Sequence, residues 1–316
     1  MKSKNPGGIN MLIAIDHGNY AVKTENHSFV AGLAEHTVKP PLTDEILEYD
    51  GKYWTLSGKR LNYRRDKTVD ESYFILSLIA IAKEMESAGR TNPFEQVQLA
   101  VGLPPEHYGV LKDKFAQYFQ RDGVIKFVYK EKPYSIIIER VMVFPQAYAA
   151  VVPQSTLIMN SPRIFIVDVG GYTTDILLLK NGKLDFQYCR SLESGIITMN
   201  NEIIRKVNAL HDMIIDDEHI SDVLCGRETI LPADVIETIK GSTKKHADNI
   251  LNQLRELQVD LRSNPAIFVG GGSILLRPFF ESSHLIAKAS FIESPNANAI
   301  GYEMLGKAQM NRHPNA

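Results

Sequence analysis

The sequence predicts an α/β fold built from two related domains, and three observations lead to this prediction. Strand-like and helix-like segments alternate along the chain, which is the pattern of sheets covered by helices. The length of 316 residues suits two domains of ~150 residues each. An apolar strand, an aspartate and a glycine-containing turn occur twice, at 12–19 and at 164–171, so each half of the chain restarts in the same way.

The first half opens on a tail and a buried strand. Residues 1–10 carry turn formers without periodicity and are expected to form a flexible tail. The apolar run 11–15 is followed by an aspartate and, two residues later, by a glycine. This pattern is typical of a strand that enters a tight turn. The further elements predicted here are a hairpin at 45–54 around Asp50-Gly51, a largely buried helix from residue 70 to about Gly89, a strand at 96–103, a helix at 108–119, a strand at 136–144 and a short helix opened by Pro145.

The second half begins with three strand-like runs. Gly170-Gly171 separates the first two, and Asn181-Gly182 between the second and third is a strong signal for a two-residue hairpin. The predicted elements are strands at 163–169, 174–180 and 183–190, helices at 194–209 and 232–259, a strand at 266–269, a helix after Gly270-Gly271-Gly272 and a last helix at 298–308.

The composition excludes several classes of protein. With 44% hydrophobic and 23% charged residues the chain is near the average of soluble proteins, and its longest apolar stretch, 73–82, is shorter than the ~20 residues of a membrane-spanning helix. Two cysteines and the lack of a signal segment favour the cytoplasm over a disulfide scaffold. The net charge of −2 gives no general attraction for nucleic acid, and the basic cluster between Lys59 and Lys67 is interpreted as a solvated loop.

Several familiar fingerprints do not occur in the sequence. There is no G-x-x-x-x-G-K-[ST] and no G-x-G-x-x-G after a strand, which disfavours P-loop and Rossmann chemistry. Metal-binding C-x-x-C and H-E-x-x-H patterns are missing, and no G-x-S-x-G supports a nucleophilic serine.

Two turns are the main candidates for chemistry. They are Asp16-His17-Gly18-Asn19 and Asp168-Val169-Gly170-Gly171-Tyr172-Thr173-Thr174-Asp175. Glycine lets backbone N–H groups approach a phosphate closely, and the hydroxyls of Thr173 and Thr174 add donors. An aspartate at each strand end suits Mg²⁺, which holds carboxylates through its waters. Either motif alone is more often an ordinary turn, whereas the pair predicts a phosphate site.

A third glycine motif combines a strand, a glycine run and a helix start. It is Phe268-Val269-Gly270-Gly271-Gly272-Ser273, and it would let a flat base or a phosphate lie against bare backbone. A flexible linker is the alternative, and the apolar segments on both sides of the run disfavour it.

Five segments, in order, resemble the nucleotide-cleft motifs of the actin, sugar-kinase and DnaK-chaperone superfamily. They are Ile15-Asp16-His17-Gly18-Asn19, Phe144-Pro145-Gln146-Ala147, the run from Asp168 to Asp175, Val269-Gly270-Gly271-Gly272 and Asn298-Ala299-Ile300-Gly301. Within the superfamily the chain most resembles the bacterial plasmid-segregation actins of the ParM/StbA type, because it is short and lacks a substrate-binding insertion. The resemblance implies an actin-like ATPase fold with two related α/β domains around an interdomain nucleotide cleft.

The resemblance also implies a discontinuous first domain. Domain I is expected to span residues 11–155 together with the C-terminal helix at 296–316, and domain II residues 156–295. The segment 30–92 is expected to form a small subdomain that supplies filament contacts.

The resemblance further assigns roles to individual residues. Asp16 and Asp168 would hold Mg²⁺ through water, next to the phosphates of ATP or GTP. The residues that would contact the phosphates are Gly18, Asn19, Gly170, Gly171, Tyr172 and Thr173, and those that would pack against the nucleoside are Gly270, Gly271, Gly272 and Ser273.

Three further side chains have two interpretations each. Glu202 and Lys206 would reach the ribose or base, or they form an exposed i, i+4 ion pair. Lys23 would neutralise phosphate, although we favour a surface lysine on the second strand.

Gln146 is the candidate for orienting the attacking water. Segregation actins often have glutamate at the matching place, whereas this chain resembles eukaryotic actins in having glutamine. A primary amide is a poor proton acceptor near neutrality, so we expect slow hydrolysis that relies on positioning and on Mg²⁺ electrostatics. The alternative is an ordinary polar residue at a helix start after Pro145.

Together these features predict an ATPase that polymerises with ATP bound and depolymerises after hydrolysis. In the resembled family such filaments move plasmids apart and reach DNA through a small DNA-binding adaptor on a centromere-like site, so we expect no direct sequence-specific DNA binding and no membrane partner. The alternatives are a small-molecule kinase or phosphatase of the same superfamily and a non-polymerising nucleotide-binding scaffold.

Overall fold

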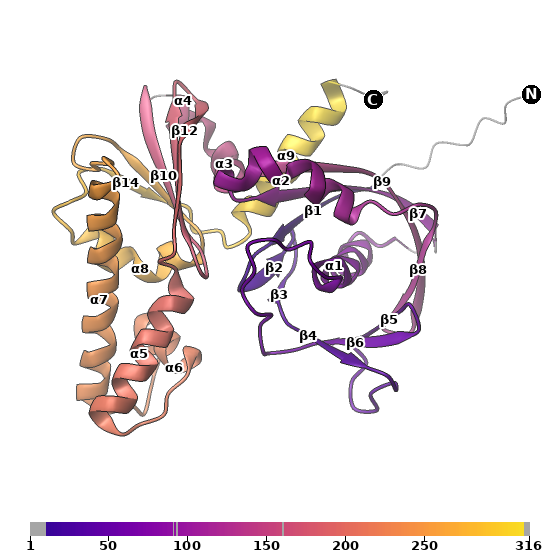
Figure 1. Ribbon diagram of the computed structural model, residues 1–316, viewed down its shortest axis with the longest axis horizontal. Coiled ribbons are helices and arrows are strands. Elements are labelled where there is room, and N and C mark those ends of the chain that lie inside the picture. The colour runs from indigo at the N-terminus through magenta and orange to yellow at the C-terminus, as the bar shows by residue number, and fades with distance from the viewer. Residues whose placement is uncertain (1–10, 91, 93, 160, 313–316) are drawn as a thin grey trace, which may run out of the picture. The chain divides into compact units, whose positions relative to one another are not determined.

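The chain divides into two compact units (Figure 1). The computed structural model describes residues 11–90, 92, 94–159 and 161–312. Unit 1 consists of Met1–Pro153 and Asn298–Ala316, and unit 2 of Gln154–Ala297. The predicted flexible tail at 1–10 lies outside the described residues.

Unit 1 contains one large mixed sheet. Its elements are β1 (Met11–His17), β2 (Ala21–Lys23), β3 (Ser28–Val30), β4 (Leu33–His36), β5 (Ile46–Tyr49), β6 (Lys52–Leu56), α1 (Ser72–Ser87), β7 (Phe94–Leu103), α2 (Pro105–Phe119), β8 (Ile125–Tyr129), β9 (Lys132–Pro145), α3 (Tyr148–Val151) and α9 (Ala297–Arg312). The strand order is β3-β2-β1-β7-β9-β8-β5-β6-β4, with β1, β7 and β9 parallel. Figure 1 shows this sheet curving around α1.

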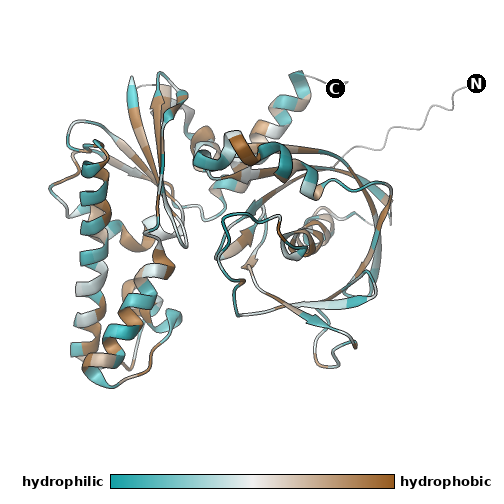
Figure 2. Cartoon of the chain, in the orientation of Figure 1, coloured by the Kyte–Doolittle hydropathy of each residue, from teal (hydrophilic) through white to brown (hydrophobic). Residues whose placement is uncertain are grey.

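The two faces of the central strands pack on different helices. In β1, Ile13 and Ile15 belong to the core that includes α1, whereas Ala14 between them belongs to a second cluster that contains Tyr302 of α9. This alternation follows from the two-residue period of a strand. Helix α1 is apolar on nearly all sides and therefore stable only inside the core, as its sequence predicts. In Figure 2 the central strands of both units are coloured as hydrophobic.

Unit 2 contains a smaller sheet with its helices. Its elements are α4 (Ser155–Met159), β10 (Arg163–Val169), β11 (Thr174–Lys180), β12 (Lys183–Leu192), α5 (Ile196–His211), α6 (Asp217–Leu224), α7 (Ala233–Glu256), β13 (Ala266–Val269), α8 (Gly271–Glu281) and β14 (Ala289–Phe291), and the 3-10 turn η1 (Val152–Gln154) precedes α4. The strand order is β12-β11-β10-β13-β14, with β10, β13 and β14 parallel. Apolar residues of α5, α6, α7 and α8 share one core with this sheet.

The internal repeat predicted from the sequence is present in the topology. In unit 1 an antiparallel set β3-β2-β1 continues into the parallel neighbour β7, and in unit 2 an antiparallel set β12-β11-β10 continues into the parallel neighbour β13. The prediction of two related α/β domains is therefore confirmed.

Most predicted elements are present, and the hairpin turns have the expected backbone. Asn181 and Gly182 both have positive φ angles, of 49° and 74°, as a two-residue hairpin with this twist requires. The prediction that Pro145 opens a helix is wrong: Pro145 is the last residue of β9, and α3 begins only at Tyr148. Within the described residues no helix combines the length and hydropathy needed to cross a membrane.

Candidate functional site

In unit 1, Asp16 and Gln146 meet at the carboxyl ends of parallel strands. Asp16 lies near the end of β1, and Gln146 directly follows β9. The carboxyl ends of β1, β7 and β9 lie at the same sheet edge because the three strands are parallel. Gln146 Nε2 donates to Asp16 Oδ1 across 3.0 Å, and the two side chains are only 9% and 4% exposed. With its nitrogen on Asp16, Gln146 keeps the amide oxygen as the atom that can accept a hydrogen bond from water.

The first turn connects β1 to β2 tightly. A Cβ on Gly18 would lie 2.6 Å from the carbonyl oxygen of Ala21, so only glycine fits there without a backbone shift. Lys23 lies on β2 as the register partner of Asp16, which confirms its place on the second strand. It is half-buried rather than fully exposed.

Behind this turn lies a polar group that the sequence did not indicate. Lys67 is 8% exposed, and its Nζ donates to the carbonyl oxygen of His17. The interpretation of the whole basic cluster as a solvated loop is therefore wrong for Lys67, which tertiary packing buries.

His17 itself is fully buried in aromatic surroundings. Its ring stacks on Phe119 at 4.8 Å between centroids, and its Nε2 is 2.7 Å from Ser77 Oγ. Burial first, and the positive charge of Lys67 second, hold the pKa of His17 well below its ordinary value. The residue after Asp16 is thus a neutral histidine.

In unit 2 the second turn is attached to the start of α5. The carbonyl oxygens of Gly170 and Gly171 accept the backbone N–H groups of Ile196 (3.1 Å) and Ile197 (2.7 Å). A Cβ on Gly195 would lie 2.4 Å from Gly171 O, so the close approach requires glycine. The turn from Gly170 to Thr173 is thus held by the first residues of a helix, and Tyr172 lies half-buried within it.

The hydroxyls of this turn are used differently from what the sequence suggested. Thr174 is fully buried and donates to the carbonyl oxygen of Ser194 at 2.6 Å, so the expectation that it offers a donor to phosphate is wrong. Thr173 Oγ1 is 3.4 Å from Asp175 Oδ2 and lies half-buried in the turn itself.

Asp168 lies between a second carboxylate and a bare glycine. Asp168 and Asp175 are register partners in the antiparallel pair β10–β11, and both are buried. Gly270 follows β13 with a φ of 84°, and a Cβ there would lie 2.3 Å from Asp168 Oδ1. Register partners in an antiparallel pair direct their side chains to the same face of the sheet, and carboxylate oxygens are the ligands that a hard cation prefers. The donor set therefore fits a hard cation such as Mg²⁺, and Asp175 is a site candidate that the sequence reasoning did not single out.

The glycine run begins α8. Gly271 is exposed, whereas a Cβ on Gly272 would lie 2.6 Å from both Ile196 Cγ1 and Val169 Cγ1. Ser273 is fully buried and donates through Oγ to the carbonyl oxygen of Gly270 at 2.8 Å. Gly270 and Gly271 are thus the members of the run nearest to solvent.

Glu202 and Lys206 lie on the exposed side of α5. Lys206 Nζ donates to Ser242 Oγ of α7 at 3.0 Å. Among the ion pairs formed by described residues none joins Glu202 to Lys206, so the alternative of an i, i+4 pair is not what the structure contains. His246, one turn after Ser242, is buried, and burial lowers its pKa despite the nearby charge of Glu202.

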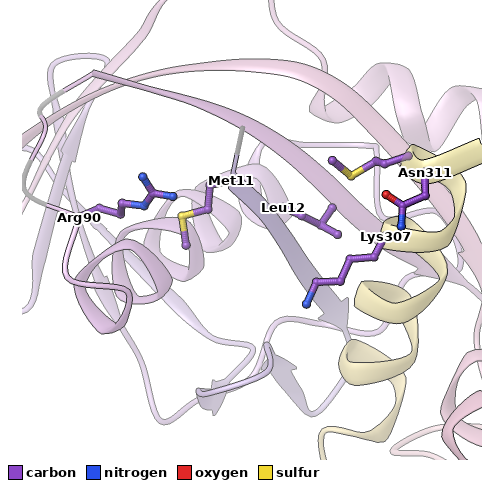
Figure 3. A pocket seen from close by; sticks show the side chains of 6 residues that line it. Met11, Leu12, Arg90, Lys307 and Asn311 are labelled. Atoms are coloured by element: carbon purple, nitrogen blue, oxygen red, sulfur yellow. The ribbon is translucent and has the colours of Figure 1, made fainter. Parts of the chain in front are cut away.

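A cavity of about 370 Å³ in unit 1 is separate from these residues. Met11, Leu12, Arg90, Lys307, Met310 and Asn311 line it (Figure 3). It lies at the start of β1, and Asp16 is four residues further along the strand, ~13 Å away at the usual rise. This cavity is therefore separate from the two predicted phosphate-binding turns.

Two family models match the chain. The model of the N-terminal domain of actin-like proteins matches residues 14–148. The model of the C-terminal domain of archaeal MreB-like actin homologues matches residues 166–282. No curated protein sequence matches the chain.

Solved structures of actin-like proteins match almost the whole chain. A 15-stranded ParM filament from Clostridium botulinum has a TM-score of 0.73 at 19% identity and covers 95% of this chain and 100% of that chain. The ADP complex of the archaeal actin homologue Ta0583 has a TM-score of 0.71 at 18% identity, with 94% and 99% covered. ParM from Bacillus thuringiensis with ATP has a TM-score of 0.67 at 12% identity, with 96% and 100% covered. The resemblance to ParM-type proteins is thereby confirmed at the level of the fold.

Proposed function

The chain has the actin-like fold, and on that premise we propose that it binds a magnesium nucleotide, hydrolyses it slowly and assembles into filaments. The observation that carries the proposal is the repeated half-site. In each unit an aspartate is the second-last residue of a strand and a glycine turn follows that strand. The next strand along the chain then returns antiparallel, and a later strand pairs in parallel on the other side. Chains of this fold have been solved with ATP, with ADP and as a filament, which supports the same activities here.

The half-site of each unit would contact a nucleotide, ATP or GTP. The turns at Gly18-Asn19 and at 170–173 supply backbone N–H groups for the phosphates, and Lys23 adds a positive charge. The start of α8 at Gly270 and Gly271 would offer bare backbone to the nucleoside, and Glu202 and Lys206 on α5 would reach its ribose or base. Each of these roles is a proposal built on the positions described above.

Asp16 and Asp168, with Asp175 beside Asp168, are the residues that would hold Mg²⁺. Bound there, the ion supplies charge stabilisation for the phosphoryl group. Within the described residues no three His, Cys, Asp or Glu side chains form a metal-binding group. Because Mg²⁺ gives up its waters reluctantly, these carboxylates would hold the ion through its water shell.

Hydrolysis would depend on positioning by Gln146. Its amide nitrogen is held by Asp16, and its amide oxygen accepts a hydrogen from the attacking water. Because an amide is not a strong base, hydrolysis would be slow. Filaments would then assemble before the nucleotide is hydrolysed.

Filaments of this protein would act in plasmid segregation in the cytoplasm. The net charge of −2 gives no general attraction for DNA, so a small DNA-binding adaptor on a centromere-like site would connect the filament to its cargo. A membrane has no role in this scheme.

Assembly of the full chain tests the proposal. We would follow light scattering and sedimentation at tens of micromolar protein with ATP, GTP, ADP or no nucleotide, each with Mg²⁺ or EDTA, and measure phosphate release in parallel. Assembly that requires a triphosphate and Mg²⁺ is the expected result. No assembly under any condition, including added crowding agent, would overturn the filament, and phosphate release without assembly would favour the non-polymerising scaffold.

A further inference from the structure

The backbone next to Gln146 adopts a strained turn. Ala147 has a φ of 60° and a ψ of −47°, and the N–H of Tyr148 donates to the carbonyl oxygen of Gln146 at 2.6 Å. These are the features of a three-residue γ-turn with positive φ, a rare conformation that an L-residue with a Cβ adopts only under constraint. The direction in which the side chain of Gln146 leaves the backbone depends on this turn.

One side chain holds the turn in place. Asn298 Oδ1 accepts the backbone N–H of Ala147 at 2.9 Å. The N–H of Gln146 is bound separately, to the carbonyl oxygen of Leu103 at 2.8 Å. Ala147 is fully buried, so its N–H has no access to bulk water if the asparagine is lost. Since only the oxygen of a carboxamide can accept a hydrogen, the orientation of the Asn298 amide is fixed as well.

Asn298 is in turn fixed by the packing of α9. A Cβ on Gly301 would lie 1.9 Å from the carbonyl oxygen of Ala149, so the N-terminal part of α9 lies directly against the backbone of α3. One residue later Tyr302, fully buried, stacks on Phe144 at 6.3 Å with an interplanar angle of 17°. The oxygen that binds Ala147 is therefore carried by a rigidly docked helix.

We infer that Asn298 is a positioning residue that acts through Gln146. Its amide oxygen stabilises the strained turn at Ala147, and the turn directs the Gln146 amide onto Asp16. The role in hydrolysis rests on the proposed function, whereas the clamp on the turn is a property of the fold.

Phosphate release and nucleotide affinity test the role in hydrolysis. We expect Asn298→Ala to slow phosphate release about tenfold to a hundredfold, the scale of a misplaced reacting group, and to leave the Kd for nucleotide nearly unchanged. Asn298→Asp keeps an acceptor oxygen and should retain most of the rate. In a Gln146→Ala background, Asn298→Ala should have no further effect, because both act at the same step. Independent losses that multiply in the double variant would overturn the inference.

A second measurement does not depend on hydrolysis. Glycine adopts positive φ without strain, so Ala147→Gly should let the turn form without its clamp. We expect Asn298→Ala to lower the Tm of the full chain, and Ala147→Gly/Asn298→Ala to recover a large part of that loss. Equal losses in both backgrounds would overturn the clamp, whereas a wild-type chain that releases no phosphate would overturn the proposed function instead.

Discussion

The side-chain amide of Gln146 donates a hydrogen bond to the carboxylate of Asp16, although 130 residues separate the two in the chain. The parallel arrangement of β1, β7 and β9 brings them to one sheet edge, and burial protects the bond from competing water. A water molecule oriented by Gln146 would therefore lie next to Asp16, a carboxylate that is proposed to hold Mg²⁺.

Substitution of Gln146 tests its part in hydrolysis. We expect Gln146→Ala to slow phosphate release by roughly tenfold to a hundredfold with little change in nucleotide affinity, because the variant loses only the orientation of water. Gln146→Glu places a second carboxylate about 3 Å from Asp16, where two like charges raise the pKa of the pair. Its rate should rise with pH through that raised pKa, since only the ionised form accepts a proton.

Measurements of phosphate release from pH 6 to 9 would check both variants, with wild type as the reference. Unchanged rates in Gln146→Ala and in Gln146→Glu would remove Gln146 from the mechanism.

Local patterns predicted the elements that carry the candidate site, and tertiary packing decided the rest. The end of β1 next to Asp16 and the hairpin at Asn181-Gly182 depend on neighbouring residues, so the sequence contains enough information for them. Strands of three or four residues such as β2 and β4 are too short to show a period.

Two features near the site have no local signal at all. Lys67 has the sequence context of a solvated charge, and only the fold buries it against His17. An alanine at 147 gives no indication of a positive φ, because the constraint comes from Asn298, which lies 151 residues away. Interactions between distant segments therefore set the details that chemistry needs.

Replacement of Lys67 tests whether its buried amine supports the first turn. Lys67→Met removes the donor to the His17 carbonyl and leaves a buried acceptor, which should lower the free energy of unfolding by about 1–3 kcal/mol. The same variant should weaken nucleotide binding, since a positive charge next to the first turn is lost. Lys59→Met is the matched control: Lys59 is exposed in the same basic cluster, and its loss should change stability by less than about 0.5 kcal/mol.

Urea titrations followed by tryptophan fluorescence would measure this difference. Trp54 is the only tryptophan of the chain and packs against the core of unit 1, so its emission reports that unit. Equal stability of the two lysine variants would contradict the structural role of Lys67.

Gly270 and its neighbour Gly271 should respond differently to substitution by alanine. Gly270→Ala forces a side chain into a positive φ and within 2.3 Å of Asp168 Oδ1, so the carboxylate must move. We expect a loss of nucleotide and Mg²⁺ affinity of at least about tenfold, together with a stability cost of about 1–3 kcal/mol. Gly271→Ala adds a methyl group with no atom within 4 Å at the start of a helix, where alanine is the better residue by up to about 1 kcal/mol. Calorimetric titration would measure the affinity of Gly270→Ala for nucleotide and Mg²⁺, and thermal unfolding would compare the stability of the two variants. Equal stability of Gly270→Ala and Gly271→Ala would show that Asp168 is not constrained by residue 270.

The neutral state of His17 predicts a dependence of stability on pH. Its pKa is lowered in the folded chain, while in the unfolded chain it returns to about 6.5. Below that pH the unfolded state binds a proton that the folded state does not, so the free energy of unfolding falls as the solution is acidified, by up to about 1.4 kcal/mol per pH unit from this group. Above about pH 7 the contribution is constant.

Trp54 fluorescence in urea titrations between pH 5 and 8 would isolate this contribution. We expect His17→Gln to be less stable than wild type at pH 8, because the stacking on Phe119 is lost, and the difference to shrink as the pH falls. The variant at exposed His284, His284→Gln, should follow the wild-type curve throughout. His246 is also buried, and both proteins retain it. The difference between the wild-type and His17→Gln curves therefore excludes any contribution of His246 to the pH dependence of stability. Parallel curves for wild type and His17→Gln would mean that His17 has the same pKa in the folded and the unfolded chain, and the neutral histidine behind the first turn would have to be abandoned.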